Sequence, residues 1–407
     1  MRVLLSAYQC GPGMGSVSQI GWEWYSRLAR RTPVTLFTHI RNRSALEAAG
    51  APIDGSEIRY IDTEWFAGPL YATAKRIFPR SEHAVFLMSS LDYFPYDAAV
   101  LRQARKSPEH WQVVHQVTPV SPSAITRLHK LGRPLIIGPL NGGLQSPVAF
   151  PELMKADSGW VYRLGRLPRL LDNALGSSAG AARLLVANET TRAALPPEHR
   201  RKCVTMLENG VDLSLFQPQP WPSCTSPLRV LFVGRLIPVK GVNFLIEAVR
   251  RLQGELNVEV TIAGDGPMSG EWQQLADSKG VGAQFRFLGN RPLSELPALH
   301  AASHVFCLPS VRESGGAVLL EAMACARPII AVGYGGPAVV TEDAVGLALP
   351  PDGPEPLTEA LTEALRDIAH NPDNWRERGL EGRRRAEASF SWDARIEQAL
   401  RIYREVT

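Results

Sequence analysis

Short apolar runs recur along the chain and alternate with longer stretches in which apolar side chains are spaced for helices. In the first half the runs lie at residues 3–7, 34–38, 113–116 and 134–138. Their apolar positions are continuous rather than alternating, as strands buried on both faces of a sheet require. Residues 20–29, after the first run, have helical spacing. The pattern predicts alternating strands and helices, which form parallel sheets with right-handed crossovers.

The second half repeats this alternation more clearly. Gly241–Leu252 carries apolar side chains at Val242, Leu245 and Val249, which is the spacing of an amphipathic helix. Residues 391–407 predict a last helix with no strand after it. The predicted strands are residues 229–234, 259–264, 285–289, 304–308 and 328–332.

A proline-rich segment, Gln217–Ser223, separates the two halves. Its prolines remove backbone donors and fix the chain, so neither a helix nor a central strand continues through it. The length of 407 residues also exceeds one typical domain. We predict an α/β protein with two doubly wound domains that face each other across a cleft, since ligands bind at the carboxyl ends of such sheets. The expected boundaries are an amino-terminal domain at 1–212, a linker at 213–227, a second domain at 228–390 and a helix at 391–407 that packs back toward the first domain.

Composition and charge narrow the class of protein. The 44 basic and 40 acidic residues give a formal charge of +4, far from the concentrated basic charge of a dedicated nucleic-acid binder. Hydrophobic residues at 45% and charged residues at 21% exclude disordered, collagen-like and disulfide-scaffold proteins. The five cysteines form no CxxC pair and favour a reducing compartment. No apolar run is long enough for a signal peptide or a spanning helix, so we expect a cytoplasmic protein, with peripheral contact at the inner face of the membrane as an option.

Two cations follow the first predicted strand of the second half. Arg235 comes directly after residues 229–234, and Lys240 precedes Gly241 at the start of the next helix. Fixed cations at the carboxyl end of a strand and the amino end of a helix form a candidate anion site. Two solvated surface charges are the alternative.

Glutamates and glycines surround a predicted helix start after the strand at 304–308. Gly315 and Gly316 would let backbone N–H groups approach a phosphate at the helix amino terminus. Glu313 precedes the helix, and Glu321 lies two turns inside it, where an unpaired buried carboxylate would be costly. Carboxylates accept hydrogen bonds from sugar hydroxyls, so both positions suit polyol recognition. A capping glutamate and a surface glutamate are the alternative.

A tight turn, Ala263–Pro267, follows the strand at 259–264. It contains Gly264, Asp265 and Gly266 and would lie at the end of the sheet where ligands bind. A turn with only a structural role is the alternative.

Taken together, these residues resemble the carboxyl-terminal domain of glycosyltransferase family 4, whose members are retaining enzymes with the GT-B fold. The resemblance is strongest over residues 205–395 and implies two Rossmann-like domains, the first of which, at 1–212, binds the acceptor and the second of which binds the donor. Cys325–Arg327 stands where the family has a glycine-containing turn. The matching segments are Asn209–Asp212, Val233–Arg235, Lys240–Gly241, Ala263–Pro267, Phe287–Gly289, Leu308–Ser310, and Glu313 with Glu321 in an E-x7-E arrangement.

The resemblance implies a role for each of these residues. Arg235 and Lys240 would hold the donor diphosphate and stabilise its departure. Glu313 would contact the donor sugar, and Glu321 would accept hydrogen bonds from the ribose hydroxyls. Further donor contacts would come from Gly264, Asp265, Gly266, Leu288, Arg291, Ser314, Gly315, Gly316 and Ala317.

The first half contributes a glycine loop, Gly11–Gly15, that is not a GxGxxG fingerprint. Pro12 disfavours a dinucleotide-binding turn at this position. In the resemblance, Gly15 would lie near the donor and Gly13 near the acceptor.

Two polar side chains follow predicted strands of the first half. His115 is expected to end its strand and resembles the family's amino-domain histidine near the transferred sugar, which would make it catalytic. A structural histidine is the alternative. Asn141, after the strand at 134–138, is a candidate acceptor contact.

Aromatic and basic side chains mix in two stretches. Trp160–Leu171 could rest on an anionic membrane surface or receive a lipid-linked acceptor, and an ordinary surface helix is the alternative. Trp65–Tyr71, followed by Lys75 and Arg76, has the same two interpretations.

Neither a metal nor a cofactor is expected. The chain has no D-x-D triplet and no HExxH sequence. His300 and His304 stand at helical spacing without an obvious carboxylate partner. Lysine and arginine side chains would take the place of a metal at the leaving group.

The resemblance therefore implies a retaining hexosyltransferase. The donor would be a nucleoside-diphosphate sugar, with UDP favoured over GDP, and the acceptor a hydroxyl of a glycan or lipid-linked molecule in surface polysaccharide or lipid-linked glycan synthesis. No nucleic-acid partner is expected. Two other classes stay open: a nucleotide-sugar epimerase with the same two-domain architecture, which turns over without an acceptor, and a non-catalytic protein that binds a nucleotide sugar.

Overall fold

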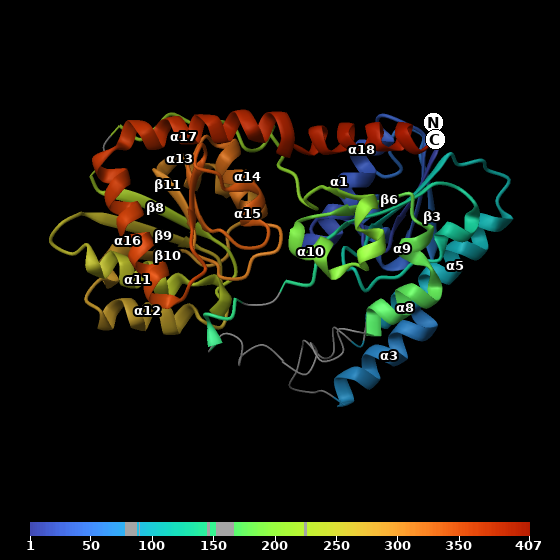
Figure 1. The fold of residues 1–407 in the computed structure, drawn as a ribbon, viewed down its shortest axis with the longest axis horizontal. Coiled ribbons are helices and arrows are strands. Elements are labelled where there is room, and N and C mark those ends of the chain that lie inside the picture. The colour runs from blue at the N-terminus through green and yellow to red at the C-terminus, as the bar shows by residue number, and fades with distance from the viewer. Residues whose placement is uncertain (78–87, 89, 145–146, 152–166, 224–225) are drawn as a thin grey trace. The chain divides into compact units, whose positions relative to one another are not determined.

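A computed structural model describes residues 1–77, 88, 90–144, 147–151, 167–223 and 226–407 (Figure 1). These residues divide into two compact units. The amino-terminal unit comprises Met1–Gly143, Val161–Glu208 and Ile396–Thr407. The carboxyl-terminal unit comprises Leu144–Trp160 and Asn209–Arg395.

The sheet of the amino-terminal unit has the strand order β3-β2-β1-β4-β5-β6-β7, with parallel pairing throughout. The order reverses between β1 and β4, where Leu5 lies opposite Leu36 on one side and His115 on the other. Such a switch point opens a crevice at the carboxyl ends of the strands. The strands are β1 (Val3–Ala7), β2 (Val34–His39), β3 (Glu57–Ile61), β4 (Val113–Thr118), β5 (Leu135–Leu140), β6 (Arg183–Val186) and β7 (Cys203–Thr205), and the α-helices are α1 (Ser16–Ala29), α2 (Arg43–Ala48), α3 (Glu64–Ile77), α5 (Tyr93–Lys106), α8 (Leu167–Leu175), α9 (Ser177–Gly180) and α10 (Glu189–Ala194).

The sheet of the carboxyl-terminal unit has the order β10-β9-β8-β11-β12-β13 and is also parallel, with its switch point between β8 and β11. Figure 1 shows α11, α12 and α16 on one face of this sheet and α13 and α14 on the other. The strands are β8 (Leu228–Val233), β9 (Val258–Ala263), β10 (Phe285–Phe287), β11 (Val305–Leu308), β12 (Ile329–Val332) and β13 (Gly346–Leu349), and the α-helices are α11 (Val242–Arg251), α12 (Ser269–Ser278), α13 (Leu296–Ala302), α14 (Ala317–Ala324), α15 (Pro337–Val340), α16 (Pro354–His370), α17 (Pro372–Arg385) and α18 (Trp392–Val406), the last of which continues into the amino-terminal unit.

The two doubly wound sheets confirm the predicted fold class, and each strand predicted from a continuous apolar run is present. The strands that the pattern missed are β3, β6, β7 and β13. β3 and β7 are the edges of their sheet, where side chains are only partly covered. β6 and β13 begin with Arg183 and Gly346, so that only three residues of each strand are apolar.

The border between the units lies at Glu208 and Asn209, before the end of the predicted first domain at residue 212. The reason is a backbone connection to the chain near the start of α18. The Val211 amide donates to the Phe390 carbonyl at 3.0 Å, and the Trp392 amide donates to the Val211 carbonyl at 3.2 Å. These bonds hold residues 209–212 in the carboxyl-terminal unit.

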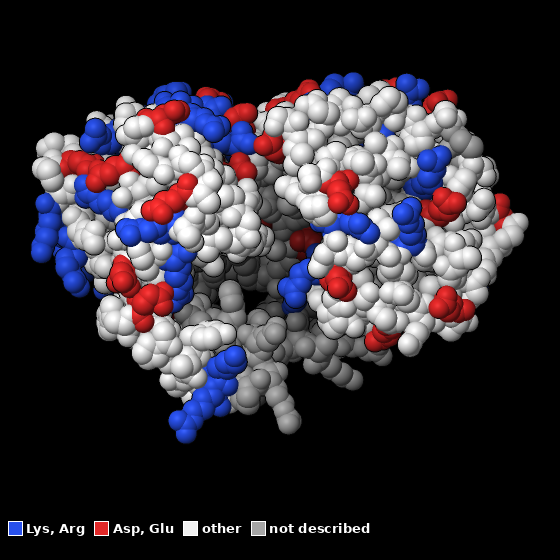
Figure 2. Space-filling view, turned by 180° about the vertical axis from the view of Figure 1, so that it is seen from behind, with Lys and Arg blue, Asp and Glu red and all other residues white. Residues whose placement is uncertain are grey.

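Basic and acidic side chains lie among one another on the face that Figure 2 shows, in keeping with the small net charge. Among the described residues, none of the helices combines the length and the apolar character needed to cross a bilayer.

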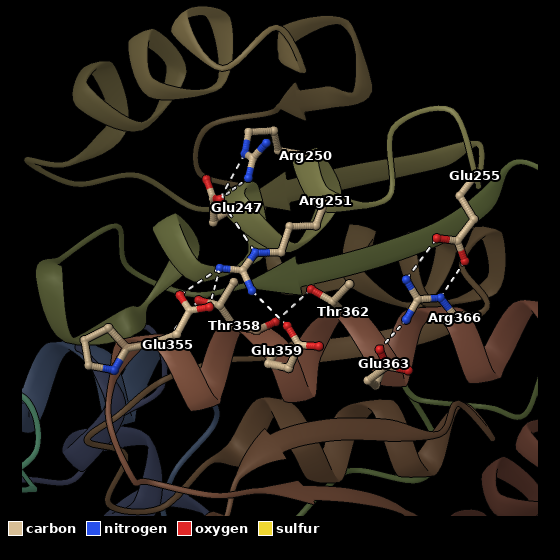
Figure 3. A network of polar contacts seen from close by, with 11 residues as sticks. Glu247, Arg250, Arg251, Glu255, Glu355, Thr358, Glu359, Thr362, Glu363 and Arg366 are labelled. Carbon is tan, nitrogen blue, oxygen red and sulfur yellow. Dashed lines mark hydrogen bonds and ion pairs between the residues drawn. The ribbon is translucent and has the colours of Figure 1, made fainter.

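Helices α11 and α16 pack side by side, and an ion-pair network borders their contact (Figure 3). Arg251 of α11 donates to Glu355 of α16 at 2.7 Å and to Glu359 at 2.9 Å, and it lies 3.7 Å from Glu247 of its own helix. The Arg251 side chain is 22% exposed. Arg250, in contrast, pairs with Glu247 inside α11 and with no other carboxylate among the described residues.

Substitution of Arg251 tests this network. We expect Arg251→Ala to lower the melting temperature by about 2 °C at low ionic strength, because exposed ion pairs contribute little individually but here one guanidinium serves three carboxylates. The loss should shrink in 0.5 M salt as the charges are screened. Arg250→Ala is the matched control and should leave the melting temperature nearly unchanged. Equal losses in both variants would contradict a role for the bridge between helices.

Candidate functional site

Two predicted site residues meet at the switch point of the carboxyl-terminal sheet. Lys240 lies in the 3₁₀ turn Pro238–Lys240 after β8, and Glu313 lies in the loop after β11, the strand that pairs with β8. The Lys240 ammonium contacts the Oε2 atom of Glu313. Their side chains are 17% and 13% exposed. The pair therefore sits at the carboxyl edge of adjacent strands, where doubly wound sheets bind ligands.

Close backbone packing holds these two loops together. The Val311 amide donates to the Val239 carbonyl at 3.0 Å, and the Ser310 hydroxyl donates to the same carbonyl at 3.2 Å. Gly241 has a φ of +68°, and a Cβ at this position would lie 2.2 Å from the Pro309 carbonyl oxygen. Only glycine fits both the conformation and the space. The position of Lys240 thus depends on Gly241.

Glu313 also faces the start of α14. Its Oε1 atom accepts a hydrogen bond from the Gly316 amide at 3.3 Å, and its backbone carbonyl accepts one from the Gly336 amide at 2.9 Å. Gly316 has a φ of +63° and immediately precedes Ala317, the first residue of α14. The first-turn N–H groups of an α-helix lack intrahelical partners and favour negative charge. The glycines at 315 and 316 therefore lie where backbone N–H groups can approach an anion.

Glu321 lies in the second turn of α14 and differs from the other carboxylates of the unit. Its Oε2 atom is buried and has no hydrogen-bond partner among the residues that the structure describes. Burial raises the pKa of Glu321 to about 7. An unpaired buried carboxylate is unfavourable for folding, and such groups concentrate at functional sites. Hydroxyl groups of a ligand would satisfy it.

The glycine turn after β9 packs against neighbouring strand ends. A Cβ on Gly264, whose φ is +137°, would lie 2.0 Å from the Gly234 carbonyl oxygen. The Gly264 amide donates to the Gly289 carbonyl at 2.8 Å, and the Leu236 amide donates to the Asp265 carbonyl at 2.9 Å. The turn is therefore held between the loops that follow β8 and β10.

The other predicted donor contacts occupy the same edge of the sheet but differ in exposure. Arg235 is exposed at the end of β8, and its side chain makes no hydrogen bond or ion pair with a described residue. Arg291 is 39% exposed and lies 3.6 Å from Glu295. Leu288 is half-buried, whereas Ser314 is exposed. Arg235 is thus the cation with the most freedom to meet a phosphate.

The glycine loop of the amino-terminal unit lies between β1 and α1. Gly13 has a φ of +74°, and Gly15, which precedes α1, has a φ of +108°. A Cβ on either residue would meet no other atom within 4 Å. Both glycines are therefore required by backbone conformation rather than by crowding, and their ligand contacts stay predictions.

The prediction that His115 ends its strand and is catalytic is wrong. His115 lies inside β4, which continues to Thr118, and it is fully buried. Its Nε2–H donates to the Gly138 carbonyl at 2.6 Å, so Nδ1 accepts from the Tyr403 hydroxyl at 2.5 Å. Burial lowers the pKa of His115 to about 4. Both ring nitrogens are occupied inside the core, where no substrate reaches them.

Asn141 follows β5, as expected. Its amide nitrogen donates to a carboxylate oxygen of Glu208, and its Oδ1 atom is buried without a hydrogen-bond partner in the described part of the chain. An acceptor contact for Asn141 stays a prediction. Most of the basic and aromatic stretch at 160–171 lies outside the described residues, which resume at Leu167.

Within the described ranges, no three His, Cys, Asp or Glu side chains are grouped closely enough to hold a metal ion.

Residues 216–381 match the family model described as "Glycosyl transferases group 1". A relative from Mycolicibacterium smegmatis, alpha-maltose-1-phosphate synthase, is 36% identical over 240 residues, which are 53% of this chain and 59% of that protein. D-inositol 3-phosphate glycosyltransferase of Corynebacterium glutamicum is 36% identical over 50% of this chain and 51% of that protein. The matched region thus spans little more than half the length of these relatives.

Solved structures resemble the whole chain. Anabaena Alr3699/HepE in complex with UDP matches with a TM-score of 0.65 and 17% identity, over 99% of both chains. WaaG, a glycosyltransferase involved in lipopolysaccharide biosynthesis, matches with a TM-score of 0.59 and 18% identity, over 98% of this chain and 99% of that one. The fold is therefore of the GT-B type, and the family match in the carboxyl-terminal unit supports a glycosyltransferase.

Two glycines with left-handed backbone test how the site is held. We expect Gly241→Ala to destabilise the protein by about 2–4 kcal/mol, because the new methyl group adds a clash with Pro309 to the cost of a left-handed alanine. Gly254→Ala is the matched control: its φ is +80° and its surroundings are open, so we expect a loss of about 1 kcal/mol. Chemical denaturation measures both. Equal losses would mean that the contact between Gly241 and Pro309 does not constrain the site.

Proposed function

We propose that the chain is a retaining glycosyltransferase of family 4 that transfers a hexosyl unit from a nucleoside-diphosphate sugar to an acceptor hydroxyl. The observation that carries this proposal is the meeting of Lys240, Glu313 and the amino terminus of α14 at the switch point of the carboxyl-terminal sheet. A cation, a carboxylate and the backbone N–H groups at the start of α14 fit the diphosphate and the hydroxyls of such a donor.

The cations would stabilise the leaving diphosphate. An ammonium has three N–H donors, so Lys240 keeps two after its bond to Glu313. Arg235 and the first turn of α14 add further positive charge. Charge that develops on the diphosphate oxygens as the sugar departs is thus met by groups already in place. These groups belong to the chain itself, so we propose that transfer needs no metal or cofactor.

The remaining donor contacts follow from the same edge of the sheet. Glu313 would accept hydrogen bonds from hydroxyls of the sugar, and Glu321 would accept them from the ribose hydroxyls. The Oε2 atom of Glu321 has no hydrogen-bond partner among the described residues. The backbone from Gly315 to Ala317 would meet the sugar and phosphate. The base would lie against the turn at 264–266, beside Leu288 and Arg291. The UDP in the HepE complex supports a uridine nucleotide as the first to test.

We propose front-face substitution for the chemical step. The acceptor oxygen forms a bond to the anomeric carbon on the side from which the diphosphate oxygen departs, and its proton passes to that phosphate oxygen. Glu313 is bonded to Lys240 and to the Gly316 amide, which suits a hydrogen-bond acceptor better than a nucleophile. Retention of configuration follows from departure and attack on one face.

We assign the acceptor to the amino-terminal unit, with Gly13 and Asn141 as contacts. Trp65 is 72% exposed, Tyr71 52% and Ile77 56% on α3, whose last turn carries Lys75 and Arg76. Apolar and basic side chains on one helix support peripheral contact with an anionic membrane surface. We therefore place the enzyme in the cytoplasm, at the inner face of the membrane, in surface polysaccharide or lipid-linked glycan synthesis.

Nucleotide binding tests the donor site. We expect UDP at about 100 times its dissociation constant to stabilise the protein by about 2.7 kcal/mol. Lys240→Ala should weaken UDP binding by about tenfold to a hundredfold, since a charge-assisted hydrogen bond is lost. Arg235→Ala should act in the same direction, and Arg250→Ala, on the outer surface of α11, is the control. Thermal melts with UDP, GDP and ADP measure all of these effects, and a chain that none of the three stabilises would contradict the proposal.

The pH dependence tests Glu321. Because burial raises its pKa to about 7 from 4.5, the free protein loses stability as pH rises through this window. Donor hydroxyls require the ionised carboxylate, so binding releases a proton below pH 7. We expect affinity for UDP-glucose, which does not titrate here, to fall by up to tenfold per pH unit between pH 7 and 5.

Glu321→Gln removes the titrating group and keeps its shape. The variant should bind UDP-glucose more weakly at pH 8, with an affinity that is flat from pH 5 to 8. Calorimetry in buffers of different ionisation enthalpy counts the released proton. A wild-type affinity that does not change with pH would refute the assignment of Glu321 to the donor.

A further inference from the structure

A hollow with charged side chains in a largely apolar lining lies in the amino-terminal unit, at the carboxyl ends of β1, β2 and β3. Tyr8 follows β1, His39 ends β2, and Glu64 begins α3 shortly after β3. The hollow has a volume of about 320 Å³. We call it the Arg41 pocket, and it is lined by Arg41, Glu64, Ala67, Gly68, Tyr71 and Asp92.

A buried carboxylate anchors this pocket. Asp92 is only 4% exposed, and its Oδ2 atom accepts from the Tyr8 hydroxyl at 2.5 Å and from the Arg41 guanidinium at 3.2 Å. The Nε–H of Arg41 donates to Glu64. Three chain segments far apart in sequence therefore converge on one guanidinium, which fixes its plane.

His39 and Thr63 hold the backbone under Arg41. The Arg41 amide donates to the Nδ1 atom of His39 at 3.2 Å, so His39 is protonated on Nε2, which donates to the Thr63 hydroxyl at 2.9 Å. Burial and the nearby Arg41 lower the pKa of His39, which keeps the ring neutral. The Tyr8 ring meets the imidazole edge-on, with centroids 5.3 Å apart. The floor of the pocket is thus organised before any ligand arrives.

Polar atoms remain available on the wall of the pocket. The Nη2 group of Arg41 and the Oδ1 atom of Asp92 have no hydrogen-bond partner among the described residues, and the Arg41 side chain is 44% exposed. Tyr71, 52% exposed, adds an aromatic surface. A guanidinium, carboxylates and an aromatic ring together suit a ring that carries hydroxyl groups on its edge and C–H groups on its face.

The charge of the pocket selects among such ligands. One cation, Arg41, stands against two carboxylates, Glu64 and Asp92. A phosphate would meet this net negative charge, whereas a neutral hydroxyl group can donate to a carboxylate and accept from the guanidinium at once. The pocket therefore disfavours phosphorylated ligands.

We infer that the Arg41 pocket binds a neutral sugar unit of the acceptor. This inference rests on the proposed glycosyl transfer and specifies its acceptor as a carbohydrate that is not phosphorylated on the unit bound here. The pocket uses residues of the amino-terminal unit alone, so its ligand binding can be measured apart from the donor.

Gly68 offers a direct test because it lines the pocket from within α3, where a Cβ would meet no atom within 4 Å. Gly68→Leu therefore adds an apolar side chain to the lining of the hollow at a position where its Cβ has room. Gly270→Leu in α12 is the matched control, a helical glycine with equally open surroundings in the other unit. Glu64→Gln replaces a charged carboxylate of the pocket with a neutral amide of nearly the same size.

The probes are the methyl glycosides of glucose, galactose, mannose and N-acetylglucosamine, together with glucose 6-phosphate, measured by saturation-transfer NMR with and without UDP. We expect at least one glycoside to bind, and to bind at least tenfold more weakly to Gly68→Leu and to Glu64→Gln. Gly270→Leu should bind it as the wild type does. Glucose 6-phosphate should bind at least fivefold more weakly than methyl glucoside.

The inference fails if no glycoside binds the wild type, if Gly68→Leu binds as well as Gly270→Leu, or if the phosphorylated sugar binds more tightly. UDP affinity, followed in the same samples, separates this result from the donor site. UDP binding without glycoside binding overturns the Arg41 pocket and leaves the proposed function standing. Glycoside binding without UDP binding overturns the proposed donor and leaves the pocket standing.

Discussion

The parallel pairing of β8 with β11 is the constraint on which the candidate donor site depends. The two strands are neighbours in the sheet, yet the chain leaves them in opposite directions, toward β9 on one side and β12 on the other. Their carboxyl ends therefore open a gap that no crossover helix fills. Lys240 and Glu313 project from the loops on the two sides of that gap.

Backbone crowding sets how closely those loops approach. Gly241 against Pro309 and Gly264 against Gly234 are contacts between main chains, with no side chain between them. Such packing leaves the loops little freedom, and it turns the sheet edge into a surface of backbone N–H groups and fixed side chains. The buried carboxylate of Glu321, whose Oε2 atom has no hydrogen-bond partner among the described residues, lowers the stability of the isolated protein. The same atom can bind a hydroxyl group of a ligand.

Sequence patterns could predict most of the strands and a candidate donor edge, because apolar runs and short motifs are local features. Continuous apolar runs mark central strands, and Glu313 and Glu321 lie close together in the chain. The pattern failed where partners are distant. His115 looks the same in sequence whether it is catalytic or structural, and its burial and its contacts with Gly138 and Tyr403, the latter near the opposite end of the chain, appear only in the fold. The edge strand β3 was missed for a different reason, because Glu57 and Arg59 interrupt its apolar residues.

The Arg41 pocket could not be predicted from the sequence for the same physical reason as the contact between His115 and Tyr403: its residues are far apart in the chain. Tyr8, Arg41 and Asp92 come from three separate segments, and none of them forms a motif with its sequence neighbours. What the two sheets share is topology, which gathers polar side chains at the carboxyl ends of strands in both units. What differs is charge: the edge of the carboxyl-terminal sheet offers cations and a helix amino terminus, whereas the Arg41 pocket has an excess of carboxylates. One doubly wound frame, used twice, can therefore favour an anionic ligand in one unit and a neutral one in the other.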